Sequence, residues 1–267
     1  MSLRLSGSLR DALARRDRAL YGGWICMGSP TSAEIMAGSG LDWVLIDMEH
    51  APNGLESVLG QLHAVSGYDI TPVVRVPIGD AVVIKQVLDV GAQTILVPMV
   101  STAEQAVAVA AAAQYPPVGI RGVGSALARS ARWNRVEGYL SDGGDHVSVF
   151  VQIETSDGVD NARAIAETPG IDGVFVGPSD LAASMGLLGL QTHPDVTARV
   201  EQVFADVLAA GKAVGVNAFV PEQTRRYVDA GASFVLVGAD VALLARGSEA
   251  LAEQFISRND DSGRQSY

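Results

Sequence analysis

Short apolar runs recur along the chain at regular intervals, and most of them are rich in Val and Ile. Within each run the apolar residues follow one another almost without interruption instead of alternating with polar ones. This pattern is typical of parallel β-strands that are buried on both faces. The predicted strands are 22–28, 43–49, 72–77, 94–100, 147–154, 173–178, 212–219 and 234–240.

Ala-rich segments with apolar residues at helical spacing separate these strands. The predicted helices are 32–38, which can start after an N-cap serine, 80–92, 102–114, 158–167, 195–211, 221–231 and 240–256. Eight strands that alternate with helices predict an α/β fold, the (β/α)8 TIM barrel. The alternative is an open doubly wound sheet, which would usually have fewer strands or a dinucleotide fingerprint. The nearest match to that fingerprint, at 122–127, follows no strand and lacks the last glycine.

The segment 115–146 is too long for a simple connection, and it predicts one more helix near 135–141. Long connections of this kind are more often functional than not. We expect a single TIM-barrel domain over 1–267, with its core at about 20–250 and a flexible C-terminal tail at about 257–267.

Composition narrows the class of protein. Apolar residues make up 48% of the 267 residues and charged residues 18%, which excludes a disordered chain. The net charge of −11 argues against a nucleic-acid partner. The longest apolar stretch, 106–113, is too short to span a bilayer, and the N-terminal segment lacks an apolar signal core. We therefore expect a cytoplasmic protein without a membrane partner. Its single cysteine, Cys26, cannot form an internal disulfide and is expected to be a small buried hydrophobe.

In a TIM barrel the chemistry takes place at the carboxyl ends of the strands. Polar residues stand at several of these ends: Asp47, Glu49 and His50; Arg75; Gln152 and Glu154; Ser179 and Asp180; Asn217; and Asp240. Glu154 and Asp180 follow adjacent strands, so their carboxylates can converge. Two carboxylates with water suit Mg²⁺ or Mn²⁺. The alternative is that Asp180 caps a helix and Glu154 pairs with an arginine.

His50 directly follows the second strand, where a group that titrates near neutral pH could act as a general base. Arg75 is the charged residue of an otherwise apolar strand, and a buried guanidinium needs an anion nearby. That anion could be a carboxylate or enolate of a substrate, or else a structural partner such as Glu49 or Glu154. The two lysines of the chain, Lys85 in a helix and Lys212 at the start of a strand, do not suit Schiff-base chemistry.

The stretches that hold these residues resemble the HpcH/HpaI family of class II pyruvate aldolases over about residues 20–250. The matching stretches include WVLIDMEHAPN (43–53), PVVRVP (72–77), GIRGVGSALARSARWN (119–134), VQIETSDGVDN (151–161) and GVFVGPSDLAASMG (173–186). The resemblance implies a reversible aldol reaction between pyruvate and an aldehyde. It also implies a divalent metal cofactor, Mg²⁺, Mn²⁺ or Co²⁺.

The resemblance further implies a role for individual residues: Glu154 and Asp180 as metal ligands, Gln152, Ser179 and Asp180 as pyruvate-binding residues, His50 as proton acceptor, and Arg75 as stabiliser of the transition state. It also implies that Asp89 is the acid that raises the basicity of His50. Because Asp89 ends a helix far from His50 in its own chain, we expect a neighbouring subunit to supply one of the two. The resemblance thus implies a homo-oligomer, a hexamer built as a trimer of dimers. Trp24 is expected to wall the site, with packing in the core as the alternative.

Two other functions stay open at this point. One is an aldolase for sugar acids such as 2-keto-3-deoxy-glucarate or 2-keto-3-deoxy-rhamnonate. The other is a catalytically silent barrel that binds a 2-oxo acid.

Overall fold

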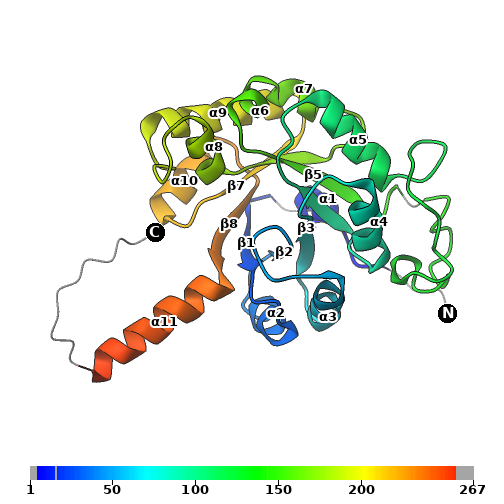
Figure 1. Ribbon diagram of the computed structural model, residues 1–267, viewed down its shortest axis with the longest axis horizontal. Helices are drawn as coiled ribbons and strands as arrows, with labels where there is room; N and C mark the ends of the chain where they lie inside the picture. Colours follow the sequence, from blue (N-terminus) through cyan, green and yellow to red (C-terminus); the bar gives the residue numbers. More distant parts are fainter. Residues whose placement is uncertain (1–4, 16, 143, 257–267) are drawn as a thin grey trace.

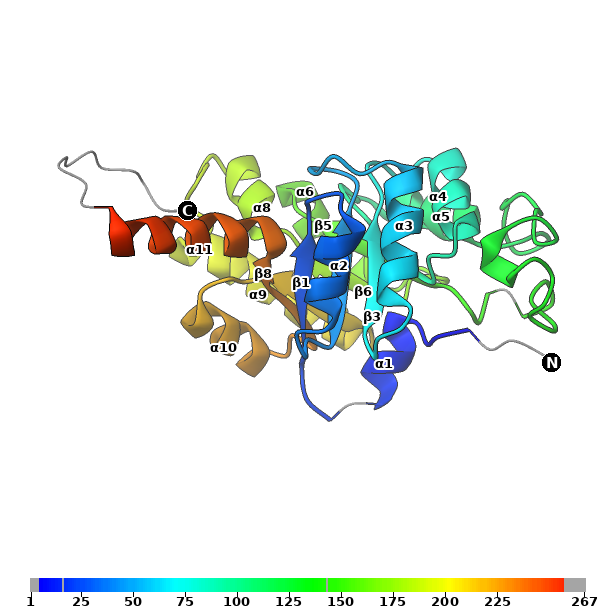
Figure 2. The same ribbon diagram turned by 90° about the horizontal axis from the view of Figure 1, so that it is seen from below.

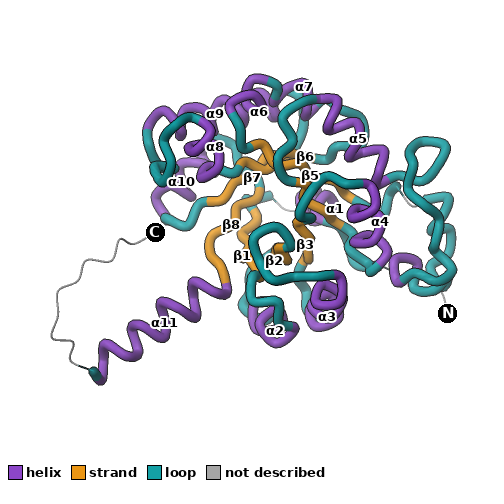
Figure 3. Tube along the Cα trace, in the orientation of Figure 1, coloured by secondary structure: helices purple, strands orange, loops and turns teal. Residues whose placement is uncertain are grey.

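The computed structural model describes residues 5–15, 17–142 and 144–256, and eight strands form a closed barrel at its centre (Figure 1). In chain order they are β1 (Leu20–Ile25), β2 (Trp43–Asp47), β3 (Thr71–Arg75), β4 (Thr94–Val97), β5 (Ser148–Ile153), β6 (Gly173–Val176), β7 (Ala213–Asn217) and β8 (Phe234–Ala239). Neighbouring strands are parallel, and β8 pairs with β1 to close the barrel. Figure 3 shows these strands enclosed by helices. The predicted TIM barrel is confirmed.

In chain order the helices are α1 (Leu9–Arg15), α2 (Pro30–Ala37), α3 (Leu55–Val65), α4 (Ala81–Asp89), α5 (Ala103–Ala113), α6 (Ser156–Asp160), α7 (Ala162–Ala166), α8 (Pro178–Ser184), α9 (Pro194–Ala209), α10 (Pro221–Asp229) and α11 (Asp240–Phe255). The helices α1, α3 and α8 were not among those predicted. Helix α2 begins two residues before the predicted start, because Ser29 caps it and Pro30 occupies its first turn. The predicted helix 158–167 is two short helices, α6 and α7.

The helix predicted near 135–141 is wrong. Residues 135–141 form turns, and the regular element nearby is a short 3₁₀ helix, η1 (Arg129–Ala131). Arg132, Trp133 and Asn134 follow it with φ angles of 50°, 56° and 63°, in the left-handed region. Three such residues in succession reverse the chain and prevent a right-handed helix from starting there.

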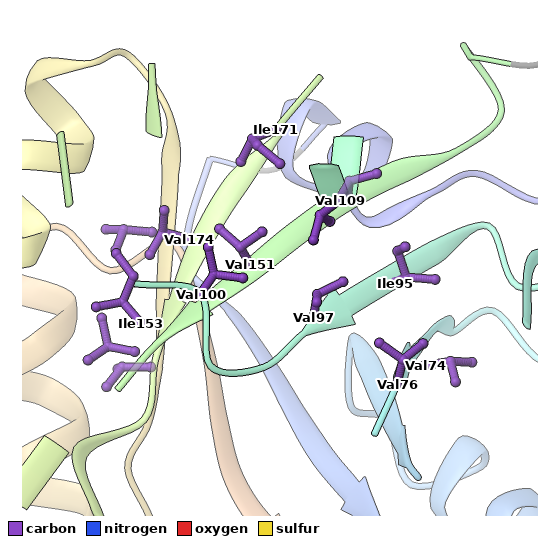
Figure 4. Close-up of a cluster of buried hydrophobic side chains, with 14 of the residues drawn as sticks. Val74, Val76, Ile95, Val97, Val100, Val109, Val151, Ile153, Ile171 and Val174 are labelled. Atoms are coloured by element: carbon purple, nitrogen blue, oxygen red, sulfur yellow. The ribbon is translucent and has the colours of Figure 1, made fainter. Parts of the chain in front are cut away.

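The core has two layers with different compositions. Aromatic rings fill the inside of the barrel, where Phe234 contacts Trp43, Phe150 and Phe175. Gly215 is required there, because a β-carbon at this position would clash with the Phe234 ring. Aliphatic side chains fill the outer layer between the strands and the helices, as Figure 4 shows for part of it. The inside of the barrel is therefore a packed core and not a channel.

Helix α1 closes the barrel at the end where the strands begin (Figure 2). The backbone N–H of Leu9 donates to Thr94 Oγ1 at the start of β4, over 2.9 Å, and Leu9 packs with the aromatic residues inside the barrel. The candidate residues lie at the other end of the barrel, where the strands finish.

Helix α11 extends away from the barrel wall in both Figure 1 and Figure 2. No helix within the described ranges is long and apolar enough to cross a membrane. The predicted flexible tail, 257–267, lies outside the described residues.

Candidate active site

A buried arginine and two carboxylates form a charged centre at the end of the barrel where the strands finish. Arg75 ends β3 directly opposite Asp47, the last residue of β2. The Nε and Nη2 groups of Arg75 each donate to an Asp47 carboxylate oxygen over 2.8 Å. Arg75 Nη1 lies 2.8 Å from Glu49 Oε2. The sequence suggested Glu49 or Glu154 as a structural partner of Arg75, and the structure shows Glu49 in that place. Asp47 is a second partner that makes two hydrogen bonds, and it was left out of the predicted catalytic and binding residues.

Asp47 also shapes the loop that carries the candidate base. Its carboxylate accepts hydrogen bonds from the backbone N–H groups of Glu49 and His50, over 3.0 and 3.4 Å. The His50 side chain is 66% exposed, and its Nε2 lies 3.8 Å from Glu49 Oε2. The arrangement gives His50 a fixed backbone beside Arg75 and an imidazole that can reach a bound molecule.

Glu154, which follows β5, is a buried carboxylate with an unusual pKa. Its Oε1 accepts from the Met99 N–H over 2.7 Å, and its Oε2 accepts from the Gln152 amide. Burial, helped by the charges of Asp180 and Glu49 and opposed by the two hydrogen bonds, raises the pKa of Glu154 to about 7. Burial likewise raises the pKa of Glu49, to which the charges of Asp47 and Asp180 add. These carboxylates are thus close enough to repel one another.

Such a group of carboxylates suits a divalent cation, whose charge would relieve their repulsion. Residue 177 is a glycine, and a β-carbon there would lie 2.8 Å from Glu154 Oε2, so glycine lets the backbone before α8 pass close to this carboxylate. Asp180 sits on the exposed first turn of α8. Gln152 Oε1 is buried without a hydrogen-bond partner among the described residues. The described residues hold no group of three or more His, Cys, Asp or Glu that could bind a metal.

Trp24 and Asn217 form an adjoining wall of the site. The Trp24 ring lies under the Arg75 guanidinium, at 4.4 Å from the ring centroid, and it is almost fully buried. Its indole N–H donates to Asn217 Oδ1 over 2.8 Å, which links β1 to the end of β7. Trp24 therefore packs in the core and has one ring face against Arg75, and its place in a substrate site stays a prediction.

Asp240, at the start of α11, fixes the loop that follows β1. Its carboxylate accepts from the N–H groups of Cys26 and Met27 and from the hydroxyl of Ser32, over 2.9, 3.2 and 2.6 Å. Burial, together with the nearby Asp47 and Asp240 charges, raises the pKa of the Cys26 thiol to about 12. Cys26 is therefore protonated near neutral pH and unsuited to act as a nucleophile.

Asp89 does not join this group. It is the last residue of α4, and its Oδ1 forms an ion pair of 2.9 Å with Arg121, whose side chain is fully buried. Arg121 belongs to the long 115–146 connection and stacks over Tyr115 at 4.6 Å. Within one chain, Asp89 is thus engaged with Arg121, on a different part of the fold from His50.

The Asp47–Arg75 pair leads to a prediction about stability. In Asp47→Ala, Arg75 stays buried with only the partly exposed Glu49 as its counter-ion. We expect the free energy of unfolding to fall by about 3–5 kcal/mol, the usual effect of breaking a buried pair. Urea denaturation measures this loss. Glu167→Ala, which breaks the exposed Arg163–Glu167 pair, is the matched control and should change the value by less than about 1 kcal/mol. Equal small losses in both variants would contradict a structural role for Asp47.

Comparisons with known proteins agree with this geometry. Residues 20–247 match the family model for HpcH/HpaI aldolase/citrate lyase. The 4-hydroxy-2-oxo-heptane-1,7-dioate aldolase of Salmonella dublin is 49% identical over 97% of this chain and 98% of its own length. A crystal structure of an HpcH/HpaI aldolase/citrate lyase family protein from Burkholderia cenocepacia superposes with a TM-score of 0.88 at 40% identity, over 93% of this chain and 99% of the other.

The citrate synthase SbnG is more distant, with a TM-score of 0.81 and 29% identity over 92% of this chain and 97% of the other. The aldolase relatives are more similar in sequence and match nearly the full chain. The chain therefore belongs to the HpcH/HpaI aldolase/citrate lyase family and is a metal-dependent aldolase.

Proposed function

We propose that this aldolase reversibly cleaves a 4-hydroxy-2-oxo acid into pyruvate and an aldehyde. One observation carries the proposal. Two acidic groups that suit a cation, Glu154 and Asp180, lie at the same end of the barrel as a buried arginine and an exposed histidine. The two other functions considered from the sequence, a sugar-acid aldolase and a silent barrel, are not favoured by the relatives.

In this proposal Glu154 and Asp180 hold Mg²⁺, Mn²⁺ or Co²⁺. When bound, such an ion supplies a Lewis acid that polarises the keto group of pyruvate. Gln152 presents its unpartnered amide oxygen to the same region, and Ser179 and Asp180 line it from the start of α8. We assign these three residues to the binding of pyruvate.

The remaining steps belong to His50 and Arg75. His50 removes a proton from the methyl group of pyruvate, and in the cleavage direction it returns that proton. Arg75 presents a fixed positive charge to the oxygen on which negative charge develops. Asp47 holds the guanidinium in place by two hydrogen bonds, so this charge needs no reorientation during the reaction.

The substrate proposed first is 4-hydroxy-2-oxo-heptane-1,7-dioate, the substrate named for relatives at 49% identity. Cleavage between its third and fourth carbons gives pyruvate and succinic semialdehyde. The test is pyruvate release from a panel that contains this compound and the 2-keto-3-deoxy acids of glucarate and rhamnonate. We expect the highest kcat/KM for the heptane dioate. A higher value for a sugar acid would overturn this choice of substrate, and no release from any 4-hydroxy-2-oxo acid would overturn the proposed reaction.

We also propose that the enzyme is a homo-oligomer, and by resemblance a hexamer. Helix α11 supports this, because Asp240 alone among its residues is buried while Leu243, Leu244, Leu251 and Phe255 are each more than half exposed. Apolar surface on this scale calls for a protein partner, and a second copy supplies one. An oligomer also gives Asp89 a route to the His50 of another subunit.

Subunit mixing tests the shared site. We expect His50→Ala and Asp89→Asn proteins to be impaired separately and to regain activity when their subunits exchange, because some hybrid sites then hold both intact groups. Sedimentation at assay concentration gives the oligomeric state. A fully active monomer would exclude a shared site.

A cytoplasmic location completes the proposal. It is consistent with the single unpaired cysteine, Cys26, since disulfides are rare in that compartment.

A further inference from the structure

We infer that Asn217 is a specificity-determining residue: its amide NH₂ donates a hydrogen bond to an oxygen on the chain of the acceptor aldehyde. Aldehydes that carry a hydroxyl or carboxylate oxygen are therefore favoured over alkyl aldehydes of the same length. This inference rests on the proposed function, because the aldehyde is a reactant only in that reaction.

The orientation of the Asn217 amide follows from its contact with Trp24. An indole N–H can donate a hydrogen bond but cannot accept one. The Asn217 atom that lies 2.8 Å from Trp24 Nε1 must therefore be the oxygen. Trp24 is itself held by burial and by the Arg75 guanidinium above its ring. The amide nitrogen is thus the end of Asn217 that faces away from Trp24.

This nitrogen is available to a ligand. It has no hydrogen-bond partner among the described residues, and it is not one of their buried, unpartnered polar atoms, so it retains contact with solvent. The neighbouring strand β8 offers no competing side-chain donor here, since Leu236, beside Asn217, and Ala239 are apolar. The single N–H of the Trp24 indole is already used. An oxygen on a ligand that passes this wall would find its donor in Asn217.

The register of the barrel places this donor beside the pyruvate and metal residues. Val216 is level with Val176 in the parallel pair of β7 and β6, so Asn217 stands level with Gly177. Gly177 lies against the Glu154 carboxylate and the Gln152 amide, because a β-carbon on it would lie 2.8 Å from Glu154 Oε2 and 3.0 Å from Gln152 Nε2. Asn217 is therefore one strand away from Ser179 and Asp180, which follow β6, and two strands away from Gln152 and Glu154 on β5. An aldehyde that meets pyruvate there can place its chain along the wall formed by Trp24 and Asn217.

The test compares kcat/KM for pyruvate condensation with matched aldehydes. Glycolaldehyde and propanal differ in one terminal hydroxyl, and succinic semialdehyde and pentanal differ in a terminal carboxylate. In Asn217→Leu we expect the oxygenated-to-alkyl ratio to fall about fivefold to tenfold for at least one pair, the usual worth of one hydrogen bond. The pair that changes identifies which oxygen Asn217 binds. Unchanged ratios in both pairs would overturn the inference.

Asn217→Asp is the matched variant, because it keeps size and an oxygen for the Trp24 indole but loses the NH₂ donor. If the hydroxyl is the bound oxygen, the ratio of kcat/KM for glycolaldehyde to kcat/KM for propanal should fall as far in Asn217→Asp as in Asn217→Leu. A preserved ratio in Asn217→Asp beside a lowered one in Asn217→Leu would overturn the role of the amide as donor. Exchange of the pyruvate methyl protons with deuterium, followed by NMR without an aldehyde, separates the two proposals. Absence of exchange in the unmodified enzyme overturns both, whereas normal exchange with unchanged ratios overturns only the role of Asn217.

Discussion

Removal of divalent metal is expected to lower pyruvate release to the background rate, and addition of Mg²⁺, Mn²⁺ or Co²⁺ is expected to restore it. The reason is electrostatic. Without the ion, the buried Glu154 carboxylate faces the charges of Asp180 and Glu49, which together with burial hold its pKa near 7. No group in this cluster of acids could replace a Lewis acid at the keto oxygen. Assay before and after EDTA treatment, with metal content measured in parallel, checks this result.

The contrary outcome is activity that survives EDTA together with a pyruvate imine trapped by borohydride. That result would require a lysine in the site. Lys212 stands immediately before β7, at the closed end of the barrel, where its Nζ donates to Ile171 O over 2.7 Å. Lys85 is on helix α4, outside the barrel. Neither lysine is placed to form the imine, so metal dependence is the stronger expectation.

His50→Ala is expected to lower kcat by a factor of about 10² to 10⁴, the usual contribution of general acid–base catalysis. The backbone around His50 is held by Asp47 through two N–H groups, so loss of the imidazole should leave the loop in place. Metal binding should also persist, because Glu154 and Asp180 are untouched. Steady-state kinetics and the exchange of pyruvate methyl protons measure the effect.

His63→Ala is the matched control, since His63 is an exposed residue of α3 outside the site and its loss should leave kcat as it is. If methyl-proton exchange in His50→Ala continues at the rate of the unmodified enzyme, His50 is not the base. The proton acceptor would then have to be sought among the carboxylates around Arg75.

The barrel was predictable from the sequence because parallel strands buried on both faces leave long uninterrupted runs of Val and Ile. The failed prediction at 135–141 shows the limit of that reasoning. Its residues have ordinary helical composition, but Arg132 to Asn134 adopt left-handed angles, and the N–H groups of Arg135 and Val136 both donate back to Ala131 O. That turn is stabilised by packing of Ala131 with Val136 and Tyr139, which no local pattern reveals.

The partner of Arg75 shows a similar limit within the site. The sequence indicated that a buried arginine needs an anion, and it pointed to Glu49 or Glu154. The choice of Asp47 depends on the register of β2 against β3, which sets Asp47 opposite Arg75. A shift of one residue would turn either side chain to the other face of the sheet. Strand-end position was the signal that could have included Asp47, since it stands in the same run as Glu49 and His50.

The closed lower end of the barrel affects the order in which pyruvate and the aldehyde bind and leave. Because aromatic side chains fill the inside of the barrel, the candidate site can be reached only from the strand ends. Gln152 and Glu154 lie deep in the site, each 2% exposed, whereas the His50 side chain lies at its mouth and is 66% exposed. Because we propose that the deeper residues bind pyruvate, we expect pyruvate to bind before the aldehyde and to leave after it. In the cleavage direction we therefore expect the aldehyde to leave first, and accumulated pyruvate to inhibit cleavage by occupying the inner part of the site.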